Sequence, residues 1–374
     1  MTNSLKSQSN PQEAAELAKL RDKIDSIDEE IGALISARAE CAQRVAEVKH
    51  RFSEGAAPVF YRPEREAQVL RKAMARNKGP LSNEEYARLF REIMSACLAL
   101  ETPLKVAFLG PAGTFTHQAA FKHFGHSTEV VSHTAIDEVF REVEAGACQF
   151  GVVPVENSTE GVVTHTLDSF LSSNLNICGE VVLRIHHNLM VSDKTKVDSI
   201  SRIYSHAQSL AQCRKWLDVH YPNAERVAVS SNAEAAKRMQ SEWNAAAIAG
   251  ETAAELYDLT IIADKIEDLP DNATRFLIVG GQKTSASGED KTSAIVAVRN
   301  EPGALHDMLE PFHRHGVDLT RVESRPARSG TWNYVFFIDF EGHIESPKVQ
   351  AALDDVAKKA ADIKVLGSYP RGVL

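Results

Sequence analysis

The sequence lacks the features of a membrane-spanning or secreted protein. Its 374 residues contain no run that approaches about 18 apolar residues, and its polar N-terminus has no apolar segment typical of a signal peptide. The five cysteines are odd in number and widely separated, and none forms a CxxC pair, so neither a disulfide framework nor a zinc site is predicted. The net charge of −9 argues against nucleic acid as a partner. We therefore expect a cytoplasmic protein with no membrane partner.

Length and composition are typical of a globular protein with two or three domains. Hydrophobic residues make up 43% of the chain and charged residues 25%. The hydrophobic pattern changes near Pro103 and again after a polar, glycine- and serine-containing segment at 282–291. These changes predict a disordered tail at 1–12, an all-α domain at 13–102, an α/β domain at 103–282 and an α+β domain at 291–374.

The first predicted helix is too long for the two helices that follow it. Apolar residues recur at steps of three and four from Leu17 to Val48, which predicts one amphipathic helix, roughly 50 Å long, ending near His50. Two shorter helices are expected to begin at Pro63, which suits a first helical turn, and at Ser82, which begins a capping box. Because two short helices cannot cover the whole apolar stripe, we expect a second copy to cover the rest, in a homodimer or a larger assembly.

Three charged residues interrupt the apolar faces of these helices. Arg38 continues the stripe of the first helix, Lys49 lies on nearly the same face three turns later, and Glu101 continues a row on the third helix. Burying an unpaired charge is costly. These residues therefore form either a buried ion network, with side chains that reach solvent at helix ends, or a polar pocket for an anionic ligand inside a helical bundle.

The segment from about Leu17 to Glu101 resembles the all-helical chorismate mutases, particularly those fused to prephenate dehydratase. The similarity lies in the motifs LRDKID, VAEVK and YRPERE, together with Arg38. The resemblance implies a Claisen rearrangement of chorismate to prephenate, which needs a folded substrate and stabilisation of charge on the ether oxygen. It implies six catalytic residues: Arg21, Arg38, Lys49, Arg65, Glu66 and Glu101.

The resemblance gives these residues distinct roles. Arg21 and Arg38 would hold the two carboxylates of chorismate, with Arg21 acting in the partner subunit's site. Arg65 and Glu66 would face the ring hydroxyl, and Glu66 would accept a hydrogen bond from it. Lys49 and Glu101 would flank the ether oxygen, where many relatives carry glutamine in place of Glu101. A carboxylate cannot donate a hydrogen bond to that oxygen, but a carboxylic acid can. We therefore predict that Glu101 acts protonated, that mutase activity falls as pH rises, and that Glu101→Gln flattens this profile.

From Pro103 to about Gly281, short apolar strands alternate with helical segments, which is typical of an α/β domain. Four motifs stand at the ends of these elements: GPAGTFT, VENS, YSHAQSLAQC and TRF. In this order they resemble prephenate dehydratase. The resemblance implies two α/β lobes like those of periplasmic binding proteins, with substrate in the cleft between them. The chain would cross to the second lobe near Ile185 and return near Lys265.

Dehydration of prephenate removes a carboxylate and the ring hydroxyl in one aromatising step. The reaction needs a hydrogen-bond donor at the departing hydroxyl, and the resemblance makes Thr274 that donor. Arg275 is expected to anchor a carboxylate, and the helix-start residue His206 is interpreted as structural. Neither a metal nor an organic cofactor is expected. The other predicted substrate-binding residues are Thr114, Thr116, Glu156, Asn157, Ser158 and Gln212.

The last stretch, from Thr292, has the strand–helix–strand–strand–helix–strand order of a ferredoxin-like fold. Its motifs GAL and ESRP resemble the regulatory ACT domain of the same enzymes. The resemblance implies that phenylalanine binds there, at a domain interface, and inhibits the dehydratase. Deleting residues from about 287 onward would then remove inhibition and leave dehydratase activity. The implied phenylalanine-site residues are Gly303, Ala304, Leu305, Glu323, Ser324, Arg325 and Pro326.

Two alternatives to a bifunctional enzyme acting on chorismate and prephenate stay open. Arogenate would fit the same fold as an alternative dehydratase substrate, although a fused mutase makes prephenate the more economical choice. A non-catalytic regulator that binds an amino acid would also combine two lobes with an ACT domain. Arg38, Lys49 and Glu66 at mutase positions argue against that second reading.

Overall fold

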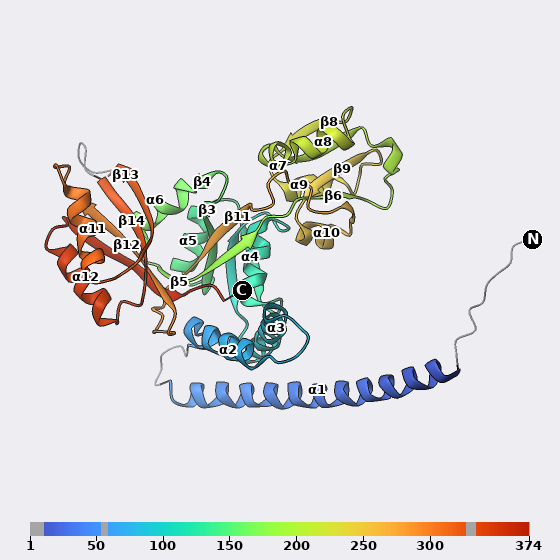
Figure 1. Ribbon diagram of the computed structural model, residues 1–374, viewed down its shortest axis with the longest axis horizontal. Helices are drawn as coiled ribbons and strands as arrows, with labels where there is room; N and C mark the ends of the chain where they lie inside the picture. Colours follow the sequence, from blue (N-terminus) through green and yellow to red (C-terminus); the bar gives the residue numbers. More distant parts are fainter. Residues whose placement is uncertain (1–10, 54–58, 327–333, 374) are drawn as a thin grey trace, which may run out of the picture.

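The computed structural model describes residues 11–53, 59–326 and 334–373, which form three modules in chain order (Figure 1). The helical module holds α1–α3, the α/β module β1–β11, and the C-terminal module β12–β15. Most of the predicted tail, residues 1–10, lies outside the described residues. Its last two residues already belong to α1, which begins at Pro11. In the described part of the chain, no helix has both the length and the apolarity needed to cross a membrane.

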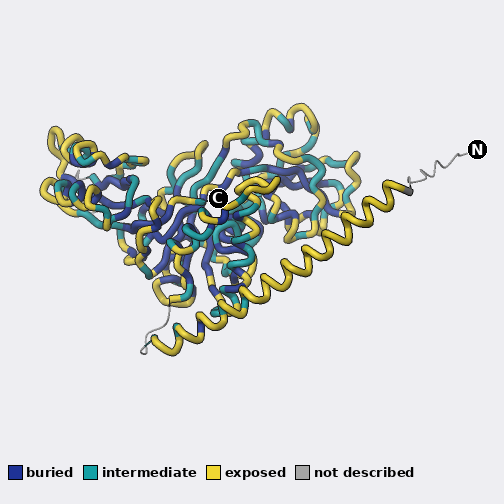
Figure 2. Tube along the Cα trace, turned by 60° about the horizontal axis from the view of Figure 1, so that its bottom comes forward, coloured by how far each residue is buried: buried dark blue, intermediate teal, exposed yellow. Residues whose placement is uncertain are grey.

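The helical module has the three helices that the periodicity predicted: α1 (Pro11–Arg51), α2 (Pro63–Arg76) and α3 (Asn83–Glu101). Ser82 caps α3 by accepting a hydrogen bond from the Glu85 amide at 3.2 Å. Helix α1 projects far beyond the other two, and most of it is exposed (Figures 1 and 2). Its apolar stripe lies open to solvent, with Leu34 70% exposed. The chain by itself therefore leaves this stripe uncovered.

The α/β module contains two sheets, one for each lobe. The first has the order β2-β1-β3-β11-β5, with β4 beside β3, and the second has the order β10-β6-β9-β7-β8. The chain passes to the second lobe after Arg184 and returns before Ala273, so the two predicted crossings are confirmed. The strands are β1 (Lys105–Leu109), β2 (Glu129–His133), β3 (Phe150–Asn157), β4 (Gly161–Val162), β5 (Asn176–Arg184), β6 (Asn188–Val191), β7 (Arg202–His206), β8 (Glu225–Val229), β9 (Ala245–Ala249), β10 (Thr260–Ala263) and β11 (Ala273–Gly280). The helices are α4 (Phe115–Phe124), α5 (Ile136–Glu144), α6 (Thr164–Ser172), α7 (Ala207–Gln212), α8 (Arg214–His220), α9 (Asn232–Arg238) and α10 (Glu251–Tyr257), with a 3₁₀ turn at Val197–Ser199.

The C-terminal module is ferredoxin-like, as predicted. One antiparallel sheet has the order β13-β14-β12-β15, and two helices pack against it. Its elements are β12 (Asp290–Val298), α11 (Ala304–Arg314), β13 (Leu319–Pro326), β14 (Tyr334–Glu341), α12 (Pro347–Ala357) and β15 (Asp362–Pro370).

The C-terminal module shares a hydrophobic core with the first lobe. Ile177 of β5 belongs to the same buried cluster as Phe337 and Tyr369 of the C-terminal sheet. A side chain at Gly367 would overlap the backbone of Ile177, so β15 and β5 approach closely. The polar segment at 282–291 that separates the two modules is also packed, because Arg71 of α2 donates a hydrogen bond to the Ser287 hydroxyl at 3.1 Å. Deleting residues from 287 onward would therefore expose this core, contrary to the expectation of a separable module.

Candidate functional sites

The helical module encloses a cavity of about 670 Å³ between the end of α1, the start of α2 and the end of α3. We call it the helical cavity. It is lined by five of the six residues that the resemblance to chorismate mutases assigns: Arg38, Lys49, Arg65, Glu66 and Glu101. Cations from α1 and α2 and carboxyl groups from α2 and α3 therefore face one space that is large enough for a small dianionic ligand.

Lys49 and Glu101 form the polar end of the helical cavity. The Lys49 Nζ lies 4.0 Å from the Glu101 Oε2, and it donates a hydrogen bond of 3.4 Å to the Phe60 carbonyl. Burial lowers the pKa of Lys49, an effect that Glu101 opposes. Burial likewise raises the pKa of Glu101, although Lys49 and Arg38 act in the opposite direction. Glu101 therefore keeps its proton to a higher pH than an ordinary carboxyl group.

Arg21, the sixth residue, does not reach the helical cavity of its own chain. It lies exposed on α1, 17 residues before Arg38, which corresponds to about 26 Å along a helix. An arginine side chain is too short to span that distance along a continuous helix. Within one chain, the set that the resemblance assigns is incomplete.

Glu66 makes an ion pair that the sequence analysis missed. The Arg91 Nε donates to the Glu66 Oε1 at 3.1 Å, and only 9% of the Arg91 side chain is exposed. Burial raises the pKa of Glu66, whereas Arg91 and a hydrogen bond from Tyr61 lower it. A signal for Arg91 was present, because it lies seven residues before Leu98 and hence on the apolar face of α3.

The two lobes of the α/β module enclose a second cavity, the interlobe cleft, of about 330 Å³. Five of the residues predicted to bind or process prephenate line it: Thr114, Thr116, Asn157, Gln212 and Thr274. Thr114 is the N-cap of α4, so the positive end of that helix faces the cleft together with its hydroxyl groups. The cleft therefore combines residues from both lobes at the ends of strands and helices.

Thr274 and Asn157 face each other across neighbouring strands β11 and β3. The Asn157 Nδ2 donates to the Thr274 Oγ1 at 2.8 Å and to the Asn272 Oδ1 at 3.1 Å. The Asn157 Oδ1 in turn accepts the backbone amides of Thr159 and Glu160 at 3.0 and 3.1 Å, which fixes the orientation of the amide. Because Thr274 accepts this hydrogen bond, its own hydroxyl proton is free to be donated into the cleft.

Arg275 does not face the interlobe cleft, which corrects the expectation that it anchors a substrate carboxylate there. Successive residues of a strand point to opposite faces, so Arg275 points away from Thr274 and toward the C-terminal module. Its Nε donates to Glu180 at 2.9 Å, its Nη1 to Asp339 at 2.5 Å and its Nη2 to Tyr369 at 2.9 Å. The guanidinium is thus fully engaged in a buried network between two modules.

Glu156 and Ser158 also lie outside the lining of the cleft. Glu156 is opposite Arg275 in the β3–β11 register and contacts Arg321 of β13 at 3.5 Å, again on the side of the C-terminal module. The Ser158 Oγ accepts the Ala273 amide at 2.9 Å and so fixes the start of β11. Strand alternation and a local turn direct these two side chains away from the cleft lining, so their role as substrate-binding groups stays a prediction.

Other cleft residues were not found from the sequence. His187 is only 1% exposed, and burial lowers its pKa. Its Nε2 lies 2.8 Å from the Gln212 Oε1, which also accepts a hydrogen bond from Asn272 at 3.2 Å. Both residues line the cleft, and the His187 Nδ1 and the Gln212 Nε2 are buried without a hydrogen-bond partner among the described residues. His206, interpreted as structural, also lines the cleft and caps α7.

The two motifs assigned to phenylalanine binding lie at one end of the C-terminal sheet. Val298, at the end of β12, and Pro326, at the end of β13, both pair with Tyr334. Gly303 then begins α11 in the left-handed conformation, with a φ of 88°. Of the remaining motif residues, Leu305 and Ser324 are exposed and Ala304 and Glu323 are partly buried. Arg325 contacts Asp168 of α6 at 3.1 Å, so ESRP reaches the α/β module directly.

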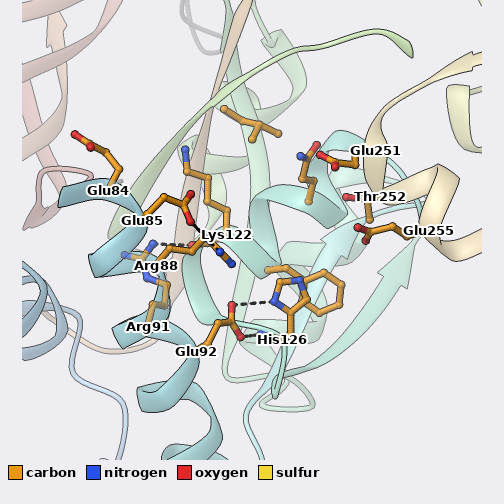
Figure 3. Close-up of a pocket in the computed structure, with 13 residues that line it drawn as sticks. Glu84, Glu85, Arg88, Arg91, Glu92, Lys122, His126, Glu251, Thr252 and Glu255 are labelled. Carbon is orange, nitrogen blue, oxygen red and sulfur yellow. Dashed lines mark hydrogen bonds and ion pairs between the residues drawn. The ribbon is translucent and has the colours of Figure 1, made fainter. Parts of the chain in front are cut away.

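A third cavity, of about 450 Å³, lies between α3, α4 and α10 (Figure 3). Two pairs of its charged groups are matched within the wall. Arg88 pairs with Glu85 at 2.9 Å, and His126 pairs with Glu92 at 2.8 Å. Arg91 also lines this cavity, and its partner Glu66 lines the helical cavity. The walls come from the helical module and both lobes, which meet here.

Comparison with known proteins matches each module to a family. Residues 20–102 match the model of chorismate mutase type II, residues 106–284 that of prephenate dehydratase, and residues 292–358 that of the ACT domain. The three matches follow one another in the order of the three modules.

Two relatives match this chain over nearly the whole length of both proteins. The chain is 66% identical to a bifunctional chorismate mutase/prephenate dehydratase of Pseudomonas aeruginosa, over 96% of this chain and 99% of the relative. It is 65% identical to the enzyme of the same description from Stutzerimonas stutzeri, over 97% and 100%. Among solved structures, a prephenate dehydratase of Arthrobacter aurescens in complex with L-Phe is 36% identical, with a TM-score of 0.66, over 72% of this chain and 90% of that one.

Proposed function

The chain belongs to the family of bifunctional chorismate mutase/prephenate dehydratases, and from this membership we propose where each reaction takes place and which residues perform it. The enzyme converts chorismate to prephenate and then prephenate to phenylpyruvate. We assign the first reaction to the helical cavity and the second to the interlobe cleft.

The assignment of the mutase reaction rests on the convergence of Arg38, Lys49, Arg65, Glu66 and Glu101 in one cavity. The rearrangement breaks a carbon–oxygen bond and forms a carbon–carbon bond, so no nucleophile is needed. Arg38 holds one carboxylate of chorismate in the folded conformation. Lys49 and protonated Glu101 donate to the ether oxygen, on which negative charge develops.

Completion of the mutase site requires a second chain. Arg21 is exposed and lies about 26 Å along α1 from Arg38. The apolar stripe of the same helix is also exposed. Pairing of two α1 helices would cover both stripes and bring each Arg21 to the partner's cavity, where it binds the second carboxylate. The proposed active form is therefore a homodimer with two shared sites.

Subunit complementation tests this arrangement. Arg21→Ala and Arg38→Ala each remove one carboxylate contact, so each purified variant is expected to lose most mutase activity. After the two variants are mixed and allowed to exchange subunits, a mixed dimer would contain one intact site and one site without either arginine. Recovery toward a quarter of wild-type activity supports sharing between subunits, because half of the dimers are mixed. Absence of any recovery, with subunit exchange verified, would show that Arg21 acts otherwise.

The assignment of the dehydratase reaction rests on the hydrogen bond from Asn157 to Thr274. This bond occupies one lone pair of the hydroxyl and directs its proton toward the ligand. Thr274 then donates a hydrogen bond to the ring hydroxyl as it departs, while the carboxylate on the ring of prephenate leaves as carbon dioxide. The partly apolar cleft favours that loss, because it removes water from the carboxylate. The hydroxyl and amide groups at the start of α4 and on Gln212 bind the side-chain carboxylate.

Substitutions of Thr274 test this role within one protein. Thr274→Val retains the shape of the side chain and removes the hydroxyl, so dehydratase kcat is expected to fall roughly 100-fold to 10,000-fold. Thr274→Ser keeps the donor and should retain most activity. Mutase activity of the same samples serves as the control for folding, since its cavity lies in another module. Dehydratase turnover that survives in the Thr274→Val variant would exclude the role.

The lining of the interlobe cleft favours prephenate over arogenate. Arogenate carries an ammonium group where prephenate has a keto oxygen, and a buried ammonium needs an anionic partner. The described residues that line the cleft include neither Asp nor Glu. We expect kcat/KM for prephenate to exceed that for arogenate at least tenfold. Equal values for the two substrates would contradict this preference.

The geometry also suggests how binding of phenylalanine at the C-terminal module affects Thr274. Thr274 and Asn157 face the cleft, whereas their neighbours Arg275 and Glu156 contact the C-terminal sheet from the back of the same two strands. A shift of β13 or β14 therefore pulls on the strand segment that holds the catalytic hydroxyl. Inhibition follows if phenylalanine favours an arrangement in which that segment is displaced.

Glycine substitutions with a matched control test the position of the phenylalanine site. Gly303 and Gly316 lie at opposite ends of α11, both at positive φ and both with open space where a side chain would project. Gly303→Ala and Gly316→Ala therefore cause similar backbone strain. Only Gly303→Ala is expected to weaken inhibition by phenylalanine, by about tenfold or more in its half-inhibitory concentration. Equal weakening in both variants would attribute the effect to strain in α11.

A further inference from the structure

We infer that Arg91 is a positioning residue for the mutase reaction and that helix α4 of the α/β module holds it in place. This inference rests on the proposed role of Glu66 as the acceptor for the ring hydroxyl of chorismate. It adds a residue that acts through Glu66 and connects the mutase site to the dehydratase module.

The contacts of Arg91 lead in two directions from α3. Its Nε donates to the Glu66 Oε1 at 3.1 Å, and its Nη1 donates to the Lys122 carbonyl at 2.7 Å. Lys122 belongs to α4, in the last turn before Gly125, where the carbonyl groups lack partners within the helix. The guanidinium is thus fixed at both ends, by a carboxylate of α2 and by the C-terminal end of α4.

Both members of the Arg91–Glu66 pair are withdrawn from solvent, with 9% and 14% of their side chains exposed. The pair differs in this respect from Arg88 and Glu85 one turn earlier, which are 55% and 54% exposed. A buried pair of this kind fixes a side chain strongly, because either partner alone would be a buried unpaired charge. Arg91 therefore holds the carboxylate of Glu66, which lines the helical cavity, in a fixed position.

A second contact strengthens the same junction. The Tyr61 hydroxyl lies 3.1 Å from the His123 Nε2, one residue after Lys122. Burial lowers the pKa of His123 to about 3, so this imidazole is neutral and brings no competing charge near Glu66. Figure 3 shows Arg91 and Lys122 on adjacent helices at the edge of the third cavity. Helix α4 thus supports both the loop before α2 and the guanidinium that orients Glu66.

The alternative is that Arg91 and Glu66 form a structural ion pair with no part in the reaction. The two readings differ in how substitutions at the two positions combine. If Arg91 acts through Glu66, its removal costs nothing more once Glu66 has lost its carboxylate. If the pair only stabilises the fold, removal of Arg91 does not lose its effect on mutase activity when Glu66 has already lost its carboxylate.

The test is a double-mutant cycle in the full-length protein with Arg91→Gln, Glu66→Gln and both together. Glu66→Gln alone is expected to lower mutase kcat/KM roughly 10-fold to 100-fold, as for loss of a charged hydrogen bond. Arg91→Gln alone is expected to lower it about tenfold, mainly through KM, because the ring hydroxyl carries no developing charge. In the Glu66→Gln background, Arg91→Gln should change kcat/KM less than about threefold.

Arg88→Gln is the matched control, since it removes the same charge from the same helix and should leave both activities unchanged. Dehydratase activity of each variant verifies folding. If Arg91→Gln gives no folded protein, Arg91→Lys enters the same cycle under the same criterion.

The outcomes separate this inference from the proposed function. Normal mutase kinetics in the Glu66→Gln variant would refute the role of Glu66 itself. Impaired Glu66→Gln with normal Arg91→Gln, or with fully additive losses, would refute the positioning role of Arg91 and leave the proposed mutase site intact.

Discussion

Protonation of Glu101 is the prediction that most directly connects the geometry of the mutase site to a rate. The perturbation is Glu101→Gln, which replaces a donor that depends on pH with an amide donor that does not. In the wild-type protein, the protonated acid is the active form. Mutase kcat/KM should therefore be constant below the pKa of Glu101 in the free enzyme and fall tenfold per pH unit above it.

The contacts of Glu101 set the direction and scale of this effect. Its side chain is 13% exposed, and Lys49 at 4.0 Å favours the ionised form. Lys49 keeps 29% of its side chain exposed, so solvent screens its attraction to Glu101. The attraction is therefore closer to the value in water, about 1 kcal/mol, than to the value of about 4 kcal/mol for a less screened pair. Burial outweighs it, and the pKa of Glu101 is raised. The two carboxylates of bound chorismate raise this pKa further, so kcat should begin to fall at a higher pH than kcat/KM.

The assay follows the loss of chorismate absorbance from mildly acidic to mildly alkaline buffer. The wild-type profile should approach a slope of −1 on logarithmic axes, equivalent to about 1.36 kcal/mol per pH unit, and the Glu101→Gln profile should be flat. Dehydratase activity of the same samples shows that the chain remains folded. A Glu101→Gln variant that is inactive at every pH, or that keeps the wild-type slope, would refute the reasoning.

Three further substitutions test the packing that surrounds the sites. Arg275→Met should lower the free energy of unfolding by about 3–5 kcal/mol, measured by denaturant titration, because it leaves two buried carboxylates without this partner; an unchanged midpoint would contradict the buried network. Leu34→Asp should shift the protein toward monomer in sedimentation and lower mutase activity but not dehydratase activity, since Leu34 is 70% exposed on the stripe assigned to the dimer. Gly367→Ala should lower the thermal midpoint, because its side chain would overlap the Ile177 backbone; a thermal midpoint equal to that of the wild type would argue against close packing of β15 on β5.

Much of the fold follows from local patterns in the sequence. The three-and-four spacing from Leu17 to Val48 predicts α1, and Ser82 with Glu85 predicts the start of α3; both are confirmed. Alternation of strands and helices predicts the α/β module, and the resemblance to prephenate dehydratase implies its two lobes and their crossings. These signals survive because each depends on residues a few positions apart, whose relation is fixed by helix or strand geometry.

The direction of individual side chains was harder to predict. The TRF motif places Thr274 and Arg275 next to each other, and both were expected in the cleft. On a strand, neighbours must point to opposite faces, so only one of them can face the ligand. Which face meets the cleft is decided by the packing of the C-terminal module on the back of β5 and β11, since that module supplies Asp339 and Tyr369 to Arg275.

The sequence by itself determined the order of the three modules, their secondary structure and the charged residues that interrupt the mutase helices, because periodicity and short motifs record local geometry. Only the tertiary structure decided which distant groups meet. The pairing of Glu66 with Arg91, the anchoring of Arg91 on the Lys122 carbonyl and the core shared by Ile177 and Tyr369 join segments with no fixed relation along the chain. Such contacts depend on how whole elements pack, and packing is a property of the folded chain as a whole.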